Sequence, residues 1–474
     1  MSAGRAVAGG PGQWPVQDVV GVGFGPANLA LAVAVAEQNA HGGGRGLRSV
    51  FVERQGEFGW HRGMLLPGAT MQVSFLKDLA TMRDPGSRFT FLRYLHDKGR
   101  LADFINQKSF FPTRVEFHDY LRWCAAMVED QVRYGRQVYA LRPAADGDVP
   151  ASVLEVHTRP GSGSLAPDPA AGDVPGDEVL RARNVVLGTG LVPRFPENVT
   201  PGPRVWHSSE LLPRAAALKD RPARRFVVVG AGQSGAEAAE FLHREFPDAE
   251  ICAVFSRYGY SPADDSPFAN RIFDPAAVDD FYAAPDEVKE SLLGYHANTN
   301  YSVVDGELIE QLYRTVYQEK VAGTERLRIL NTTALTAVEE HPHGVRAVLR
   351  PLIGGDPTTL DCDAVVLATG YRPSDPRTLL GPLAEHCLTD GQGRLRIGRD
   401  HRIATTDAVR AGIYLQGAAT EHTHGITSSL LSTLAVRAGE ICDALLLDRA
   451  QRTGADAETA GLAAETGTVP LPTP

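Results

Sequence analysis

The sequence predicts an α/β protein that contains two units of the same kind. A short apolar strand, a glycine-rich turn, an apolar helix and a second strand follow one another from Asp18 to Glu53. The same order recurs from Arg225 to Ser256, so the chain contains two βαβ units. At 474 residues it also exceeds the size at which one hydrophobic core stops growing. We therefore expect at least two compact domains.

The first turn contains Gly21, Gly23 and Gly25, followed by Pro26 at the start of the helix. Glycines allow a tight turn and close approach to a pyrophosphate, and a helix N-terminus favours phosphate. Pro26 stands where the GxGxxG pattern has its last glycine, and proline is tolerated in the first turn of a helix. Glu53, after the next strand, is placed to bind a ribose hydroxyl, or it is an ordinary solvated acid. The pattern predicts a Rossmann-like dinucleotide site.

The second turn matches GxGxxG in full, and its predicted contact residues are Gly230, Gly232, Gln233, Ser234 and Gly235. The strand after it ends at Ser256 and Arg257, without an acid. Because an arginine there accommodates a 2′-phosphate, the sequence favours NADPH over NADH. An exposed surface cation is the alternative interpretation of Arg257.

Two dinucleotide sites in one chain predict electron flow from NADPH to a flavin, with FAD in the first site. Such an enzyme needs an oxidant. The five cysteines are scattered singly, so the sequence offers no CxxC pair for a redox disulfide. Nothing in the sequence indicates a quinone or metal centre, and O2 is left as the acceptor.

Composition excludes several classes of partner. A formal charge of −10 argues against general binding of nucleic acid or anionic membrane. Residues 1–16 lack the layout of a signal peptide, and the apolar run Leu29–Ala36 is too short to cross a bilayer. We expect a cytoplasmic protein whose partners are small molecules.

The predicted organisation divides the chain as follows: 1–17, disordered; 18–215 and 345–449, the FAD-binding domain with substrate-site elements; 216–344, the NADPH-binding domain with a substrate-binding insertion; 450–474, a disordered tail. The Pro/Gly-rich stretch 143–178 is predicted to form surface hairpin connections around one strand. The last apolar helix is predicted over Ser428–Leu447. Strands at Asn184–Gly190 and Ala364–Gly370 each end in Thr-Gly, which lets a ligand approach the backbone closely.

Several longer stretches, in order between Asp18 and Leu447, resemble those of microbial N-hydroxylating monooxygenases. They read GVGFGPANLALA, WHRGMLLPGATMQVSFLKDLATMRDP, FFPTRVEFHDYLRW, GAGQSGAE, HANTNYSVVD, VVLATGY and TEHTHGITSSLLSTLAVRAGEI. Within that family the sequence is most similar to the L-ornithine N5-monooxygenases, and the L-lysine N6-monooxygenases are close relatives. The resemblance implies two Rossmann-like domains and a small, mainly helical substrate-binding region.

The resemblance also implies roles for individual residues. The segment from Glu53 to His61, including Trp60, would line FAD, with Gln72 near the flavin and Val138 in backbone contact with the adenosine end. Ser429, Leu430 and Leu431 would close over the isoalloxazine. Gly232 to Gly235 and Arg257 would bind NADPH. The residues implied for substrate are Lys77 and Asn270, on the α-carboxylate, and Asn300 and Ser432, as further polar contacts that could also touch bound NADP(H).

Taken singly, these polar residues have plainer interpretations. Lys77 follows a partly apolar stretch, where a lysine is either a snorkelling surface residue or a buried cation awaiting an anion. Asn270 and Asn300 could be turn residues. His207 is interpreted as structural or cofactor-adjacent. His422 and His424 lack a third ligand at metal spacing and are interpreted as packing near the flavin.

The implied reaction is N-hydroxylation of the L-ornithine side-chain amine through a C4a-hydroperoxyflavin, which needs no covalent residue. The product, N5-hydroxyornithine, would serve siderophore or other natural-product biosynthesis, and the resemblance suggests a homo-oligomer, tetramer or dimer. Ornithine and lysine differ by one methylene, worth about 1 to 3 kcal/mol in a pocket, so the sequence leaves both open. A Baeyer–Villiger or sulfide-oxidising flavin monooxygenase and a flavin redox sensor without turnover are the rival functions.

Overall fold

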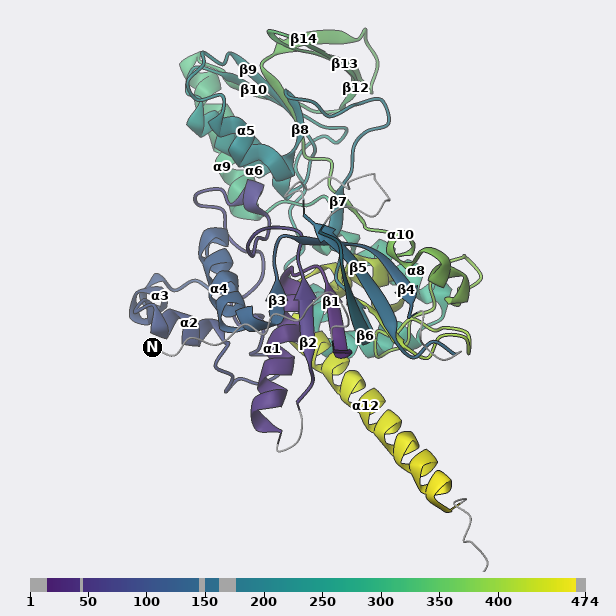
Figure 1. Cartoon of the computed structure of the whole chain (residues 1–474). Helices are drawn as coiled ribbons and strands as arrows, with labels where there is room; N and C mark the ends of the chain where they lie inside the picture. The colour runs from purple at the N-terminus through teal and green to yellow at the C-terminus, as the bar shows by residue number, and fades with distance from the viewer. Residues whose placement is uncertain (1–14, 43–45, 145–149, 162–175, 466–474) are drawn as a thin grey trace, which may run out of the picture.

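The computed structural model describes residues 15–42, 46–144, 150–161 and 176–465 (Figure 1). Each predicted βαβ unit lies in a separate sheet, and the two sheets form the lower and upper parts of the molecule in Figure 1. A two-stranded ribbon joins them, in which β7 (Leu191–Pro193) pairs antiparallel with β16 (Tyr371–Pro373). The chain therefore crosses between the two units at these two places.

The first sheet has the order β3-β2-β1-β6-β5-β4, and β17 also pairs with β6. Its parallel part comprises β1 (Gln17–Val22), β2 (Ser49–Val52), β3 (Val132–Arg133), β6 (Glu178–Leu187) and β17 (Gly412–Leu415). The strand β5 (Leu154–Pro160) pairs antiparallel with β6, and β4 (Arg136–Pro143) pairs antiparallel with β5, as expected for hairpins. Every residue of β1 is buried, as expected for a central parallel strand.

Helices pack against this first sheet and share one hydrophobic core with it. The helix α1 (Pro26–His41) begins at the proline and packs against α12 (Leu434–Glu465). Three helices, α2 (Phe91–Asp97), α3 (Leu101–Gln107) and α4 (Arg114–Met127), add an aromatic cluster to the same core. Thr90 and Thr113 cap α2 and α4 by accepting a hydrogen bond from a backbone N–H three residues ahead.

The second sheet has the order β11-β10-β9-β15-β8. Its strands are β8 (Val205–His207), β9 (Arg225–Val229), β10 (Glu250–Val254), β11 (Leu327–Leu330) and β15 (Ala364–Leu367), all parallel. They are accompanied by α5 (Leu211–Ala216), α6 (Gln233–Glu245) and α9 (Gly306–Ala322). An antiparallel meander of β12 (Thr333–His341), β13 (Gly344–Pro351) and β14 (Thr358–Cys362) completes this unit.

A helical insertion separates β10 from α9. It contains η4 (Ala269–Phe273), α7 (Pro275–Ala283), α8 (Asp286–Tyr295) and η5 (His296–Thr299). The insertion packs back on the C-terminal part of the first unit, against α11 (Glu421–His424) and η8 (Ile426–Ser429). This is the small, mainly helical region that the resemblance implies.

The structure corrects the predicted C-terminal end. The last helix, α12, runs over Leu434–Glu465, and not over Ser428–Leu447. Residues 426–429 form the separate turn η8, which ends at Leu430 in extended backbone with φ −105° and ψ 163°, so α12 begins only after it. The tail predicted as disordered from 450 is helical to Glu465, since its alanines favour helix strongly. In Figure 1, α12 projects beyond the body of the molecule.

The predicted domain boundaries also change. The sequence boundaries at 215 and 345 would place β8 and β15 in the first domain, whereas both pair within the second sheet. Strand pairing, which sequence spacing does not reveal, thus extends the second unit from Val205 to Leu367. Residues 1–14 and 466–474, within the segments predicted as disordered, lie outside the described residues, and Gln17 already belongs to β1.

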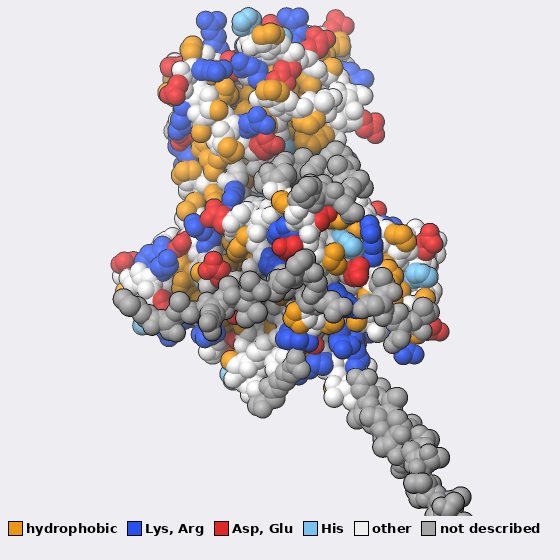
Figure 2. All heavy atoms as spheres, in the orientation of Figure 1, with side chains coloured by type: hydrophobic (Ala, Val, Ile, Leu, Met, Phe, Trp, Pro, Cys, Tyr) orange, Lys and Arg blue, Asp and Glu red, His pale blue; other side chains and the backbone are white. Residues whose placement is uncertain are grey.

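All five cysteines are free and buried. Within the described ranges, no helix combines the length and the apolar character needed to cross a membrane. On the face shown in Figure 2, acidic and basic side chains are interspersed over both parts of the molecule.

Candidate functional site

The first glycine turn is shaped by packing on one side and is open on the other. A Cβ atom on Gly21 would lie 2.2 Å from the Phe51 ring, and one on Gly23, whose φ is +80°, would lie 2.6 Å from the Gly188 carbonyl oxygen. At Gly25, by contrast, a Cβ would meet no described atom within 4 Å. Gly25 is also the N-cap of α1 and, as a glycine, has no side chain to cap the first backbone N–H groups of the helix. The open side of this turn therefore fits a pyrophosphate at the helix N-terminus.

Glu53 holds this turn from the neighbouring strand end. Its Oε2 accepts a hydrogen bond of 2.7 Å from the Phe24 backbone N–H, and its Oε1 accepts one of 2.9 Å from Gln55 N–H. The residue is only 6% exposed. Glu53 is thus part of the frame of the turn, in addition to any contact with a ribose.

Sequence reasoning missed two residues that complete this frame. Asn28, fully buried, donates through Nδ2 to the carbonyl oxygens of Val22 and Gly23, at 3.2 and 2.7 Å. Gln416, directly after β17, donates to Asn28 Oδ1 at 3.0 Å. The signal was present, since a buried amide in an Ala/Leu-rich helix must find partners. Its partner on β17 could not be known without the fold.

Trp60 and His61 follow β2 and belong to a group of aromatic rings. Their rings contact each other at 4.7 Å, and His61 also faces the Tyr371 ring at 6.1 Å. His61 is accessible to solvent, yet the protein around it and then the Arg114 cation lower its pKa to about 4. The imidazole is therefore neutral near pH 7.

Gln72 and Val138 occupy different surroundings. Gln72 is exposed, and its amide contacts the Thr70 hydroxyl at 3.4 Å. Val138 lies on β4 opposite Thr158, directly before a register irregularity. Such a bulge takes backbone groups out of the ladder, as a backbone contact with a ligand would require.

The segment Ser429–Leu431 forms the C-terminal edge of the site. Leu431 packs on the core of the first unit, beside the helices that follow the first turn. Ser432 is 6% exposed, and its hydroxyl has no hydrogen-bond partner among the described residues. A buried hydroxyl without a partner is uncommon, and it leaves Ser432 ready to bind a ligand.

The second glycine turn is tight but is completed by other segments. A Cβ on Gly230, whose φ is +138°, would lie 2.2 Å from the Ala368 carbonyl oxygen, and one on Gly235 would lie 2.4 Å from the Gly230 oxygen. Gly232 has only Ser302 backbone atoms near it, at 3.4 Å or more. Gln233 accepts a hydrogen bond of 2.8 Å from Asp305 N–H. The run from Asn300 to Asp305 therefore lies across this turn.

Arg257 is exposed and contacts the same Asn300–Asp305 run. Its Nη1 donates to the Ser302 carbonyl oxygen at 2.9 Å. Ser302 has a positive φ of 57°, uncommon for a residue other than glycine. Arg257, Gly232 and Ser302 thus meet at one place, which fits the predicted phosphate contact beside the turn.

Lys77 contacts η4, the turn that contains Asn270, from a position far away in the sequence. The Lys77 ammonium lies 5.6 Å from the centroid of the Phe273 ring, and Phe273 belongs to η4, as Asn270 does. Burial lowers the pKa of Lys77, and the nearby Asp274 carboxylate opposes that shift. Asn270 Nδ2 donates to the Asp265 carbonyl oxygen at 2.7 Å, which holds its side chain at the start of η4. Lys77 is therefore a half-buried cation that contacts the turn carrying Asn270.

Asn300 joins this group through the packing of short helices. It ends η5, and η4 packs against both η5 and η8, the turn that precedes Leu430. The adjacent Tyr301 donates to Glu421 and lies beside Ser429 and Asn300. Burial raises the pKa of Glu421. The four predicted substrate residues thus belong to segments that converge between the two glycine turns.

The histidines singled out in the sequence have structural roles. His207 is buried; its Nδ1 accepts from Ser209 N–H, so its Nε2 donates to the Gly370 carbonyl oxygen at 2.9 Å. His422 contacts the Leu395 carbonyl oxygen, and His424 stacks on His401 at 4.0 Å. Among the described residues, no group of three or more His, Cys, Asp or Glu side chains could hold a metal ion.

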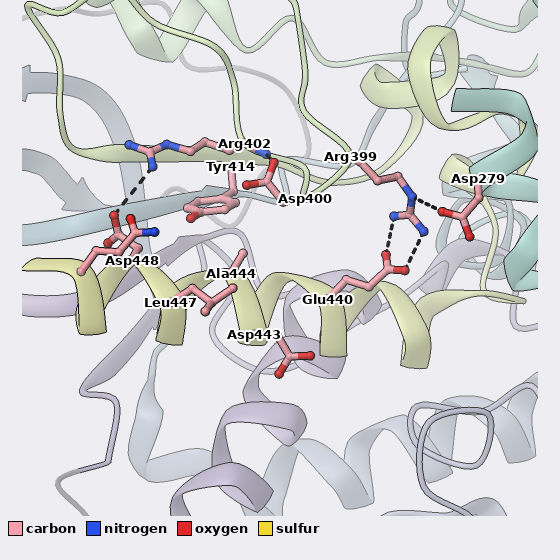
Figure 3. A pocket seen from close by; sticks show the side chains of 11 residues that line it. Asp279, Arg399, Asp400, Arg402, Tyr414, Glu440, Asp443, Ala444, Leu447 and Asp448 are labelled. Carbon is pink, nitrogen blue, oxygen red and sulfur yellow. Dashed lines mark hydrogen bonds and ion pairs between the residues drawn. The ribbon is translucent and has the colours of Figure 1, made fainter. Parts of the chain in front are cut away.

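A separate groove lies along α12, away from these residues. It has a volume of about 630 Å³ and is lined by acidic side chains, among them Asp279, Asp443 and Asp448, together with Arg399 and Arg402 (Figure 3). Arg399 bridges Asp279 and Glu440 across it. The groove contains none of the predicted site residues.

Two dinucleotide-binding turns with a polar cluster between them define a pyridine-nucleotide-linked flavin oxidoreductase. The family model of L-lysine 6-monooxygenase/L-ornithine 5-monooxygenase matches residues 15–373. The L-ornithine N(5)-monooxygenase of Burkholderia cepacia is 43% identical over 417 residues, 86% of this chain and 90% of that protein. The chain belongs to this family of N-hydroxylating monooxygenases.

Solved structures agree with this assignment. The ornithine N-hydroxylase of Kutzneria sp. 744, solved with reduced FAD, NADP+ and L-ornithine, is 46% identical, with a TM-score of 0.85 over 92% of this chain and 100% of that one. The L-lysine 6-monooxygenase of Pseudomonas syringae is 31% identical, with a TM-score of 0.77 over 91% and 99%.

Proposed function

We propose that this protein is an FAD- and NADPH-dependent monooxygenase that hydroxylates the side-chain amine of L-ornithine to N5-hydroxyornithine. The observation that carries the proposal is the convergence of Lys77, the η4–η5 insertion and the Ser429–Ser432 segment between two glycine turns. Relatives at 43% and 46% identity are ornithine hydroxylases by name. A polar cluster of this kind is what an amino acid requires, whereas ketones and sulfides do not need it.

The two turns take different cofactors in this proposal. The first would hold FAD, because Gly25 leaves room at the α1 N-terminus. The second would hold NADPH, with Arg257 on the 2′-phosphate in place of its present contact with the Ser302 carbonyl oxygen. When bound, FAD accepts a hydride from NADPH and activates O2 for transfer of one oxygen atom.

The chain's own residues bind and orient the amino acid. Lys77, a half-buried cation, would pair with the α-carboxylate, and the Asn270 and Asn300 amides would add neutral polar contacts. Ser432 offers a buried hydroxyl that has no partner in the described residues. With the carboxylate held, the distance to the flavin selects the chain length of the substrate. The site must also favour the neutral amine, since an ammonium has no lone pair for attack.

The test is product analysis with purified protein, FAD, NADPH and O2. We expect N5-hydroxyornithine from L-ornithine, with NADPH consumption coupled to product. A panel of L-lysine, diamines, ketones and sulfides accompanies it. Hydroxylation of L-lysine in preference to ornithine would move the chain to the lysine enzymes of the family. Failure of every amine to give a hydroxylamine would refute the proposal.

Three finer predictions from the sequence accompany this function. They are a cytoplasmic location, a homo-oligomeric state, tetramer or dimer, and use of the product in siderophore or other natural-product biosynthesis. Size-exclusion chromatography with light scattering measures the second directly.

A further inference from the structure

The joint between the two units contains a buried ion pair that the proposed reaction leaves unexplained. Arg114 begins α4 of the first unit, and Glu237 lies in α6 of the second. The guanidinium binds the carboxylate in a bidentate manner, with Nη2–Oε1 at 2.7 Å and Nη1–Oε2 at 2.9 Å. The two side chains are 13% and 5% exposed. Both lie in stretches, FFPTRVEFHDYLRW and GAGQSGAE, that also carry the family resemblance.

On the first unit's side, the pair is fixed to the loop after His61. Arg114 Nη1 donates to the Met64 carbonyl oxygen at 2.9 Å. Met64 and Leu66 are buried in the core of the second unit, with Trp206 and Leu211. Gly63 lies so close to this unit that a Cβ would be 1.8 Å from the Ser209 carbonyl oxygen. The loop therefore joins the two cores, and Arg114 holds its backbone.

On the other side, the pair is fixed to the second glycine turn. Glu237 Oε1 accepts a second hydrogen bond, of 2.9 Å, from Gln233 Nε2. Gln233 belongs to the turn itself and also accepts from Asp305 N–H at 2.8 Å. One carboxylate thus links the cation of the first unit to the turn of the second. A bidentate pair restricts direction as well as distance, more than a single contact does.

We propose that Arg114 and Glu237 are a positioning pair, which sets where the second glycine turn stands relative to the His61–Leu66 loop beside the flavin site. This inference rests on the proposed binding of NADPH at that turn. Hydride transfer needs the reacting atoms about 3 to 3.5 Å apart. A small rotation of one unit would therefore slow the transfer without abolishing cofactor binding.

The test compares variants that change the charge or the geometry of the Arg114–Glu237 pair. Glu237→Gln removes the charge of one partner and leaves the Arg114 cation buried without it. A double variant, Arg114→Met with Glu237→Leu, removes both charges and so avoids an unpaired buried ion. Arg114→Lys keeps the cation but loses the bidentate geometry. Arg346→Met is the matched control, because Arg346 and Asp361 form a bidentate pair, at 2.9 and 3.5 Å, on the surface of the second unit alone.

The first measurement is the distance between the two units in the FAD-loaded protein. Spin labels are placed at Ala102→Cys, on α3, and Glu310→Cys, on α9, which are exposed positions on different units. The five native cysteines are buried, so labelling is directed to the new ones. We expect one narrow distance distribution in the parent and in Arg346→Met, and a broadened or shifted one in the double variant.

The second measurement is anaerobic reduction of bound FAD by saturating NADPH, with dithionite as a reductant that needs no positioning. We expect the rate with NADPH to fall roughly 100-fold in the double variant, as a misplacement of about 1 Å would produce. The rate with NADPH should fall as far in Glu237→Gln and to an intermediate value in Arg114→Lys. Reduction by dithionite should be unchanged in all variants. An unaltered distance distribution, or an NADPH rate within threefold of the parent, would overturn the inference. Absence of NADPH-dependent reduction in the parent would instead refute the proposed function. The distances between the spin labels would still show whether Arg114 and Glu237 position the two units.

Discussion

The two glycine turns have similar sequences but are built in different ways. The first is framed within its own unit, through Glu53 and Gln416 at strand ends and Asn28 on α1. The second depends on segments from elsewhere, since the Asn300–Asp305 run crosses it and the Arg114–Glu237 pair anchors it. A turn fixed within its own sheet suits a cofactor that stays bound. A turn completed by loops suits one that enters and leaves.

The largest expected effect is at the frame of the first turn. Glu53→Ala would leave the backbone N–H groups of Phe24 and Gln55 without their acceptor. Each such loss costs about 1 to 3 kcal/mol, so we expect a lower free energy of unfolding and loss of bound FAD. Flavin content and urea unfolding measure both. Asp103→Ala, at an exposed acid on α3, is the control; equal flavin content in both variants would contradict this role of Glu53.

Alanine substitutions at corresponding glycines should have the next largest effect and should distinguish the two turns. Gly23→Ala places a Cβ 2.6 Å from a carbonyl oxygen in a backbone with positive φ, and we expect it to abolish FAD binding. Gly232→Ala meets only ordinary contacts at 3.4 Å, so it should fold with FAD and lose affinity for NADPH alone. Absorbance spectra and NADPH titration distinguish the two. If Gly232→Ala lost FAD as well, the turns would not be independent.

Lys77 tests the site between the turns. Removing a charge-assisted contact costs about 1.5 to 3 kcal/mol, so Lys77→Ala should raise the KM for ornithine about 10- to 100-fold. Flavin content and basal NADPH oxidation should be nearly unchanged. Steady-state kinetics measures the first, and loss of FAD in this variant would show that Lys77 is structural.

Arg257 should have a smaller and more selective effect. Arg257→Ala removes an exposed cation, whose loss we expect to raise the KM for NADPH about tenfold. The KM for NADH, which lacks the 2′-phosphate, should change little. Both coenzymes are titrated side by side, and equal changes for the two would remove Arg257 from the phosphate site.

The smallest expected effect is in the pH dependence of substrate binding. Burial lowers the pKa of Lys77, so its cation is present below that pKa and is lost as the pH rises through it. The KM for ornithine should therefore increase on the alkaline side. Lys77→Arg, which stays protonated, should move that increase to higher pH. A KM profile that is identical in both proteins would show that Lys77 does not bind the carboxylate.

Local patterns allowed much of the fold to be predicted. Both βαβ units, the strand between 143 and 178 and the strands before the two Thr-Gly pairs form as expected. The errors arose where pairing between distant strands decides, as with β8 and β15, or where an extended residue separates a short turn from the helix, as Leu430 does. The long helix from Leu434 was cut short in the prediction because an Ala-rich tail was interpreted as having nothing to bury.

The sequence by itself determined the two glycine turns, the family resemblance and the identity of the residues offered for substrate, because these depend on residue type and short spacing. The tertiary structure alone decided that Lys77 meets η4 from a position almost 200 residues away. It likewise decided that Gln416 supports Asn28, and that Arg114 pairs with Glu237 across the joint. The physical reason is that contacts between distant segments depend on how the sheets and helices pack.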